Sequence, residues 1–352
     1  MSLNMAWLAF GVALAGSLVL TPLVRRFALR AGALDQPGVR SVHTRPIPSL
    51  GGIAIFLAVL AALAAVGLRS GGWYNPHLLG ILAGGALITA VGIWDDVAGL
   101  PAWGKFLGQL AAAGVLLAFG VQIHFLTDPW SPQGMIALGS WGAPLTIFWV
   151  VAVVNTVNLA DGLDGLAAGI GVIAALTQVV AAFYIGESEP IPLMAAMGGA
   201  ALGFLRYNFH PARIFMGDTG SLFLGFTLAA AAVDGTVKSP TTIALVVPIL
   251  VLGLPIFDTT FALFRRLRRG QPFYRPDREH LHHRLLAAGM SQRQAVLLMY
   301  LVTAGLGVAA VLLARNEVWA ATALLVVILG GGLMAAGRRG LLAAGGRHRL
   351  GG

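Results

Sequence analysis

Aspartate residues gather in three short stretches of an otherwise apolar sequence. They are Asp95 and Asp96 in GIWDDVAGL, Asp161 and Asp164 in NLADGLDGL, and Asp218 in FMGDTGSL. Two or three carboxylates with open water positions suit Mg²⁺, which proteins usually hold with few carboxylates plus substrate phosphate. The stretches also contain glycines, which let a backbone approach an anion closely and turn its N–H groups toward it. The pattern indicates a divalent-cation site that handles phosphate.

Each stretch also has an explanation without chemistry. Asp95 and Asp96 can be a solvated helix end, Asp161 and Asp164 can form the turn before a helix, and Asp218 can be an N-cap. However, only 11% of the residues are charged, and a carboxylate near hydrocarbon is costly unless it is paired or binds a cation. One shared site is therefore the simpler interpretation of all three stretches.

Basic residues near these stretches are candidates for holding phosphate. Lys105 follows the aspartate pair and can either reach a phosphate as a point charge or simply extend to the water layer at a helix end. His280, His282 and His283 lie in DREHLHHRL, where imidazoles can contact phosphate or form ordinary polar surface. The chain has no cysteine, and its hard oxygen ligands argue against Zn²⁺.

The elements that position these residues are predicted to be membrane-spanning helices. Of the 352 residues, 57% are hydrophobic, and the mean hydropathy is +0.82. A spanning helix needs about 20 mostly apolar residues, and long apolar runs without period-two alternation favour helices over a β-barrel. We count eleven such segments, which predicts an all-α polytopic membrane helical bundle that forms one domain over residues 1–352. The ninth segment contains Asp258, which is expected to pair with Arg265. The segments are Ala6–Val24, Gly51–Gly67, Leu78–Trp94, Phe106–Val121, Leu145–Leu159, Leu166–Ile185, Ile191–Phe204, Ser221–Val233, Ile243–Phe264, Ala295–Leu313 and Trp319–Ala336.

The distribution of basic residues predicts the orientation of the bundle. If the N-terminus lies outside, all but three of the 23 Lys and Arg fall on the cytoplasmic side, the exceptions being Arg69, Lys238 and Arg315. This bias is the positive-inside rule, and it places the C-terminus and the three aspartate stretches on the cytoplasmic face. It also explains the net charge of +9 without nucleic acid as a partner. The first segment lacks a preceding basic region, so we expect a retained helix and no signal peptide.

Five motifs in order resemble the polyprenyl-phosphate N-acetylhexosamine-1-phosphate transferase superfamily. They are DQPGVRSVHTRPIPSLGGIAI, GIWDDVAGL, NTVNLADGLDGLAAG, RYNFHPARIFMGDTGSL and DREHLHHRL. The resemblance extends from about Leu34 to Gly289, which is most of the chain. The chain looks like the WecA/TagO-like branch, which starts O-antigen, enterobacterial common antigen or teichoic acid synthesis. The alternative is the muramoyl-pentapeptide transferase branch of peptidoglycan synthesis. That branch has three adjacent histidines, which Leu281 interrupts here, and it tends to carry a lysine where this chain has Gly99.

The resemblance implies a glycosyl-1-phosphate transferase of the plasma (inner) membrane with its site facing the cytoplasm. The enzyme would depend on Mg²⁺, with Mn²⁺ as a substitute. It would transfer an N-acetylhexosamine 1-phosphate, with GlcNAc favoured, from a UDP-sugar to undecaprenyl phosphate and release UMP. Membrane lipids are the other expected partners, and dimers are common among related proteins, so a homodimer is compatible with the sequence.

The resemblance also implies roles for individual residues. Asp95, Asp96, Asp161 and Asp218 would form the catalytic group, with Asp96 and Asp218 as the metal ligands. Asp95 is the candidate base that removes the last proton of the lipid phosphate, while Asn158 and Asp161 would orient the diphosphate. The other implied substrate contacts are Lys105, His280, His282 and His283 for phosphate or sugar, and Asp164, Asn208 and Phe215 for the uracil.

Two other classes share some of these features. A CDP-alcohol phosphotransferase is also a membrane enzyme with clustered aspartates, but it concentrates them in one helix pattern that this sequence lacks. A secondary transporter tends to place charges near the bilayer midplane within paired repeats. Here the acids lie toward one face, and no internal repeat is evident.

Overall fold

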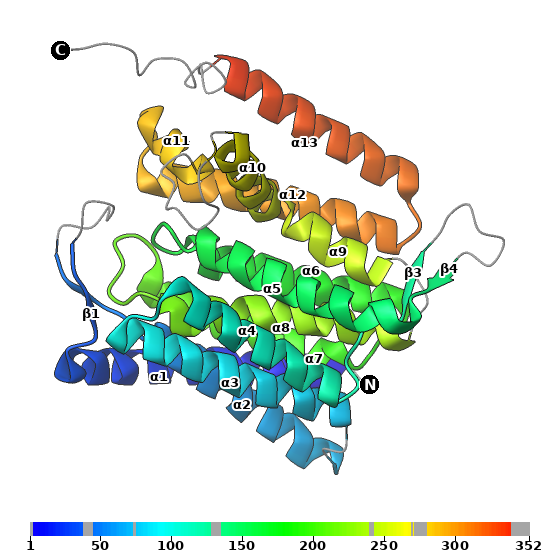
Figure 1. Cartoon of the computed structure of the whole chain (residues 1–352), viewed down its shortest axis with the longest axis horizontal. Coiled ribbons are helices and arrows are strands. Elements are labelled where there is room, and N and C mark those ends of the chain that lie inside the picture. The colour runs from blue at the N-terminus through cyan, green and yellow to red at the C-terminus, as the bar shows by residue number, and fades with distance from the viewer. Residues whose placement is uncertain are drawn as a thin grey trace.

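The computed structural model describes residues 3–37, 45–72, 75–127, 135–238, 243–268, 270 and 280–338. Within these ranges the chain is a bundle of helices (Figure 1), as predicted for an all-α membrane protein. Residues 38–44 of the first motif lie outside the described residues, as do residues 271–279, the last three of which begin the histidine motif.

Each of the eleven apolar segments is helical over most of its length, and a short helix lies in the loop before the last two of them. The helices are α1 (Leu3–Ala31), α2 (Gly51–Ser70), α3 (Pro76–Ala98), α4 (Ala102–Ala118), α5 (Gly142–Ala160), α6 (Leu166–Ile185), α7 (Pro190–Asn208), α8 (Gly217–Lys238), α9 (Ile243–Val251), α10 (Gly253–Arg268), α11 (Leu281–Ala287), α12 (Gln292–Ala314) and α13 (Val318–Arg338).

Six helices of the described part are long and apolar enough to cross a membrane. They are α1, α2, α3, α5, α6 and α12, where α5 is counted from Gly139 to Ala160. The bent pair of α9 and α10 makes a seventh if the two helices form one span. The remaining helices are shorter or less apolar, and the count of eleven spans stays a prediction.

The ninth predicted segment is two helices, where the sequence predicts a continuous one. α9 and α10 meet at an angle of 74°. Pro248 lies inside α9, and Gly253 begins α10 two residues before Pro255. Proline removes a backbone donor and clashes with the preceding turn, and glycine has low helix propensity, so three such residues within one segment break the helix.

α8 is the central helix of the bundle. Every residue from Thr219 to Gly235 is buried, and the helix packs against α3 and α5. The approach of α3 is very close at Gly92, where an added Cβ would lie 2.5 Å from the Cα of Thr219. Small residues allow such approaches between membrane helices. This contact brings the end of α3, which carries Asp95 and Asp96, to the beginning of α8.

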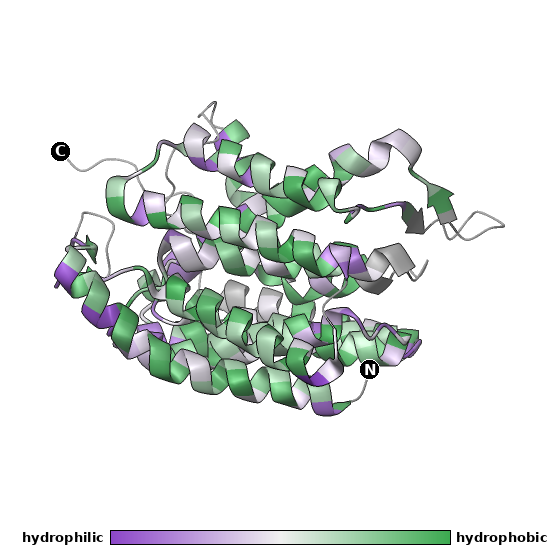
Figure 2. Ribbon diagram, turned by 90° about the horizontal axis from the view of Figure 1, so that it is seen from below, coloured by the Kyte–Doolittle hydropathy of each residue, from purple (hydrophilic) through white to green (hydrophobic). Residues whose placement is uncertain are grey.

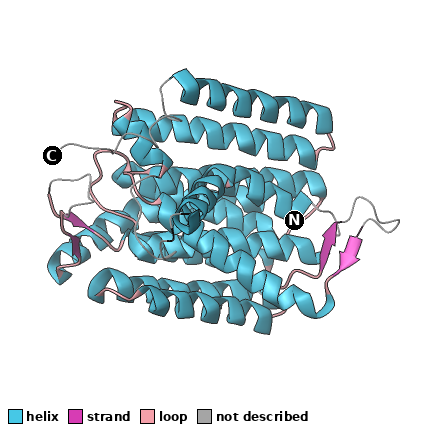
Figure 3. Cartoon of the chain, turned by 45° about the horizontal axis from the view of Figure 1, so that its top comes forward, coloured by secondary structure: helices cyan, strands magenta, loops and turns pink. Residues whose placement is uncertain are grey.

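Two short antiparallel hairpins lie at opposite ends of the bundle (Figures 1 and 3). β1 (Leu34–Asp35) pairs with β2 (Ile47–Pro48), and β3 (Phe125–Thr127) pairs with β4 (Met135–Ala137). They are small additions to the predicted all-α fold. Figure 2 shows hydrophobic residues along the helices and hydrophilic residues mainly toward the ends of the bundle, as expected where the middle faces hydrocarbon.

Candidate active site

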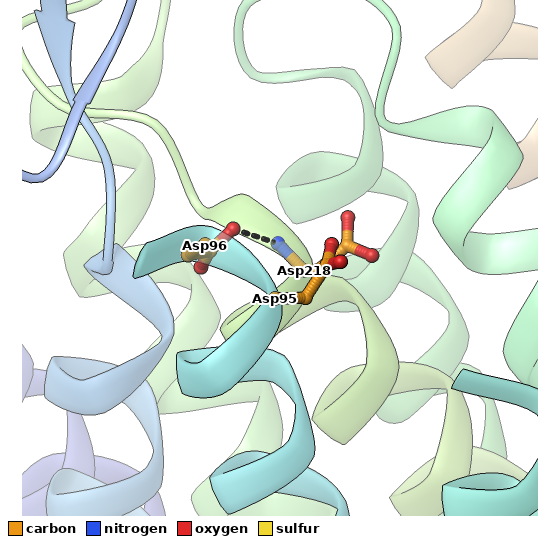
Figure 4. A group of neighbouring side chains, drawn as sticks. All are labelled: Asp95, Asp96 and Asp218. Carbon is orange, nitrogen blue, oxygen red and sulfur yellow. Dashed lines mark hydrogen bonds between the residues drawn. The ribbon is translucent and has the colours of Figure 1, made fainter. Parts of the chain in front are cut away.

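Three carboxylates from two helices meet at the end of the bundle that carries the β1–β2 hairpin. Asp95 and Asp96 lie in the last turn of α3, and Asp218 lies in the first turn of α8 (Figure 4). One oxygen of each carboxylate lies within 4.8 Å of the others. Oxygens on opposite sides of one Mg²⁺ are about 4.2 Å apart, so these residues fit a single divalent cation with little adjustment.

Asp96 anchors the beginning of α8. Its Oδ1 accepts the backbone N–H of Asp218 at 2.9 Å, the bond drawn in Figure 4, and its Oδ2 accepts the backbone N–H of Thr219 at 3.1 Å. The Thr219 hydroxyl donates to the same oxygen at 2.6 Å. A carboxylate is favourable at a helix N-terminus, where backbone N–H groups have no helical partner. Asp96 thus fixes the position of Asp218 relative to α3.

Lys105 joins the other two carboxylates. Its Nζ lies 2.6 Å from Asp95 Oδ2 and 2.7 Å from Asp218 Oδ2. On the other side of Asp218, the Asn158 amide donates to Oδ1 at 3.0 Å and also to the Ser221 hydroxyl at 2.9 Å. Lys105 therefore contributes positive charge directly to the acid cluster. From the sequence alone, Lys105 is equally compatible with a phosphate contact and with a side chain that extends to water at a helix end.

A cavity of about 520 Å³ opens beside this cluster. Its lining contains seven of the predicted site residues together with others that the sequence does not single out, among them Leu34, Asp35, Ser49 and Gln292. Asp35 and Ser49 belong to the first of the five motifs, and Leu34 directly precedes it, so this motif is the signal in the sequence for that part of the wall. Gln292 begins α12, and only its place in the fold reveals its role in the wall. The predicted residues in the lining are Asp96, Asn158, Asp161, Asp164, Asn208, Phe215 and Asp218.

Asp161 is the open carboxylate of the cavity. In the described part of the chain its side chain has no hydrogen-bond or ion-pair partner. Part of its surface faces the cavity, but the group lies deep among other acids. Burial, followed by the negative charges of Asp218, Asp96 and Asp164, raises the pKa of Asp161 to about 8. A bound cation would favour the charged form and lower this pKa.

Asp164 and Asn208 brace the cavity wall. Asp164 Oδ2 accepts the backbone N–H of Ala212 at 3.0 Å and lies 2.7 Å from His210 Nδ1. The buried Asn208 accepts the Gly165 N–H at 3.1 Å and donates to a backbone carbonyl of the following loop at 3.0 Å. These bonds tie the loop after α5 to the loop before α8. Direct contact of either residue with uracil stays a prediction.

Phe215 is placed in the lining by its backbone. Its N–H donates to the carbonyl of Pro48 at 2.8 Å, and its carbonyl accepts the N–H of Gly51 at 3.0 Å. These bonds attach the segment before α8 to β2 and the start of α2. The position is compatible with the predicted stacking on a base, which rests on the resemblance.

The histidine motif is held by Asp258. Asp258 Oδ2 lies 3.0 Å from His280 Nδ1, and its Oδ1 accepts the N–H of Leu281 at 2.8 Å, which caps α11. The sequence predicts Arg265 as the partner of Asp258, but the structure pairs it with His280. The physical reason is spacing, because Asp258 and Arg265 are seven residues apart on α10, whereas side chains on a helix meet at spacings of three or four.

His282 lies against the loop that carries Asp161. An added Cβ at Gly162 would lie 2.6 Å from His282 Nε2. The rings of His280 and His282 are parallel, with their centroids 5.8 Å apart. The ring of His283 is tilted against that of His282, with the centroids 4.3 Å apart. Burial, and then the neighbouring His283 and His280, lowers the pKa of His282 to about 4. The motif lies behind the cavity wall, and its predicted contact with phosphate or sugar stays a prediction.

Comparison with known proteins connects this site to an enzyme family. The profile of glycosyl transferase family 4 matches residues 78–236. A probable undecaprenyl-phosphate N-acetylglucosaminyl 1-phosphate transferase of Bacillus subtilis (strain 168) is 43% identical, over 88% of this chain and 86% of the relative. The chain belongs to glycosyl transferase family 4. The range matched by the family 4 profile runs from α3 to α8, so it contains the three aspartate stretches and ends before the histidine motif.

Two further relatives come from other groups of bacteria. A decaprenyl-phosphate N-acetylglucosaminephosphotransferase of Mycobacterium leprae is 40% identical, over 80% of this chain and 77% of the relative. An undecaprenyl-phosphate alpha-N-acetylglucosaminyl 1-phosphate transferase of Salmonella typhi is 30% identical, over 82% of this chain and 79% of the relative. These findings confirm that this family 4 protein is a polyprenyl-phosphate N-acetylhexosamine-1-phosphate transferase, as its motifs indicate.

Proposed function

We propose that this family 4 transferase uses a UDP-sugar, with UDP-GlcNAc preferred, and undecaprenyl phosphate, and that it releases UMP. The names of the Bacillus and Salmonella relatives support undecaprenyl phosphate as the acceptor and N-acetylglucosamine as the sugar, whereas the mycobacterial relative is named for decaprenyl phosphate. The observation that carries the proposal is the cluster of Asp95, Asp96 and Asp218 beside a cavity large enough for a nucleotide-sized ligand.

The site faces the cytoplasm of a plasma membrane in this proposal, with the N-terminus outside, the C-terminus inside and eleven spans. The positive-inside distribution supports the orientation. So does the last turn of α10, which carries Arg265, Arg266 and Arg268. A water-soluble donor then enters from the cytoplasm, and the lipid acceptor enters from the bilayer.

Asp95, Asp96 and Asp218 would hold Mg²⁺, and the ion would supply positive charge against the negative charge of the diphosphate. Asp95 accepts the last proton of the lipid phosphate. Lys105 lies between Asp95 and Asp218 and can contact an incoming phosphate oxygen, while Asn158 orients the carboxylate of Asp218.

The reaction is a direct displacement in this proposal. A lipid phosphate oxygen attacks the β-phosphorus of the UDP-sugar, a new phosphoanhydride bond forms, and the bond to the α-phosphate breaks with release of UMP. Direct attack needs no labile phosphoglycosyl-aspartate beside water. Asp161, the open carboxylate, contributes charge and orientation at the cavity wall without forming a covalent bond.

The test uses purified protein in detergent with undecaprenyl phosphate and a panel of UDP-sugars that includes the muramoyl-pentapeptide donor. We expect UMP release with UDP-GlcNAc that depends on Mg²⁺ and stops with EDTA. Preference for the muramoyl donor would reassign the substrate. Movement of an intact UDP-sugar across a vesicle membrane without UMP release would contradict the enzymatic proposal.

A further inference from the structure

A reciprocal amide pair joins α4 to α5 one turn below the carboxylates. Gln109 Nε2 donates to Asn155 Oδ1 at 3.3 Å, and Asn155 Nδ2 donates to Gln109 Oε1 at 2.7 Å. Asn155 Nδ2 also donates to the carbonyl of Val151 at 2.8 Å, within its own helix. Gln109 is buried, with 2% of its surface exposed. Because each amide is both donor and acceptor, rotation of either one or sliding of either helix breaks a bond.

The amide pair lies on the same helix faces as two groups of the acid cluster. Gln109 follows Lys105 by four residues on α4, and Asn155 precedes Asn158 by three on α5, and residues at these spacings are neighbours on one face of a helix. Lys105 and Asn158 approach opposite oxygens of Asp218, at 2.7 and 3.0 Å. α4 and α5 are thus joined twice, through Asp218 at the end of the bundle and through the amide pair one turn deeper.

The amide pair fixes the register of α4 on α5, which the contacts through Asp218 alone do not. Lys105 reaches the acids through a flexible side chain, which can follow α4 through small displacements and lose its geometry. Apolar contacts between membrane helices permit such displacements, whereas hydrogen-bonded side chains define one register. We propose that Gln109 and Asn155 are positioning residues that set the register of α4 on α5 and so deliver Lys105 and Asn158 to the same carboxylate. This inference rests on the proposed function of the acid cluster.

Four variants test the pair through both turnover and thermal stability. They are Gln109→Leu, Asn155→Leu, the double Gln109→Leu/Asn155→Leu, and the exchange Gln109→Asn/Asn155→Gln, which keeps two amides. We expect each single variant to lower kcat about tenfold with little change in KM, since a small misplacement of a contacting group reduces turnover. The double leucine variant leaves no unpaired amide, so its Tm should recover while its kcat stays low. The exchange variant should recover both. Recovery of kcat together with Tm in the double leucine variant would show a purely structural role and overturn the proposal.

A double-mutant cycle with Lys105 separates this inference from the proposed function. In a Lys105→Ala background, Gln109→Leu should cause little further loss, because its effect acts through Lys105. Fully additive losses would overturn the positioning role alone. Full activity of Lys105→Ala and Asp218→Asn would instead overturn the proposed site. The matched control is Gln178→Leu: Gln178 is also a buried glutamine, on α6, and its Nε2 has no partner among the described residues, so this variant should retain wild-type kcat.

Discussion

Asp96 and Thr219 are joined by two hydrogen bonds across 123 residues of sequence. The backbone N–H and the hydroxyl of Thr219 both donate to Asp96 Oδ2, at 3.1 and 2.6 Å. The contact ties the end of α3 to the beginning of α8, so the distance between the aspartate pair and Asp218 depends on it. Asp96 is therefore a structural anchor of the site as well as a candidate ligand.

Removing the Thr219 hydroxyl should weaken this anchor. Thr219→Val deletes a hydrogen bond to a charged group, worth about 1.5–3 kcal/mol, and leaves the shape of the side chain almost unchanged. We expect a lower Tm and a several-fold loss of UMP release. The control is Thr227→Val on the same helix, because the Thr227 hydroxyl donates only to the carbonyl of Phe223 within α8. Equal behaviour of the two variants would contradict the anchoring role.

Gly217→Ala should disable the site more severely. Gly217 has φ of +69°, and an added Cβ would lie 2.3 Å from Asp96 Oδ2 and 2.5 Å from Ser49 Oγ. The methyl group would push Asp96 from the beginning of α8, so UMP release should fall about 100-fold, the loss expected when catalytic groups move by about 1 Å. Gly32→Ala is the control, since Gly32 also has positive φ, at +70°, but has nothing within 4 Å of an added Cβ. Similar losses in both variants would attribute the effect to backbone strain alone.

Asp258→Asn should loosen the histidine motif. An asparagine has a single oxygen, so if it accepts the N–H of Leu281 its NH₂ group faces His280 Nδ1. The contact with His280 then requires the ring tautomer in which Nδ1 is an acceptor, and the charge of Asp258 is lost. We expect a several-fold increase in the KM for the UDP-sugar, because the motif packs on the loop of Asp161. The comparison is Glu317→Gln, which removes an exposed ion pair with Arg315 and should leave KM unchanged. An unchanged KM in Asp258→Asn would argue against a role of the motif in donor binding.

The buried His282 predicts a loss of stability in acid. Its pKa is about 4 in the folded chain against 6.5 when unfolded, so the unfolded chain binds more protons between these values. Stability is unaffected above the unfolded pKa and declines as pH falls from 6.5 toward 4. His282→Asn should make the decline of Tm shallower between about pH 7 and about pH 4. Identical profiles for the variant and the wild type would show that His282 does not titrate as proposed.

The sequence predicts the helices and the acidic stretches well because both depend on local composition. Apolar runs mark each helix, but the prediction of one continuous ninth segment misses the break at Gly253, although Pro248 and Pro255 lie on either side of it. Partners across the fold are different. No local pattern shows that Asp96 caps α8 or that Asp258 caps α11, since each bond depends on how distant helices pack.

The chemical role of a residue type is also easier to predict than the partners that its side chain contacts in the fold. The sequence shows Lys105 as a basic group near the acids, but its position between Asp95 and Asp218 depends on the packing of α4. The resemblance implies that Asn208 lies at the uracil, whereas the structure shows its amide holding two loops together. The homodimer stays a prediction, because it concerns a surface that a single chain does not test.

The central claim is that Asp95, Asp96 and Asp218 share one divalent ion, and Mn²⁺ binding tests it without catalysis. Mn²⁺ can stand in for Mg²⁺ and is observed directly by electron paramagnetic resonance, so purified protein can be titrated with the metal alone. We predict one bound Mn²⁺ per chain in the wild type and in Asp258→Asn, and strongly weakened binding in Asp218→Asn. Equal Mn²⁺ binding by the wild type and by Asp218→Asn would contradict the proposed site.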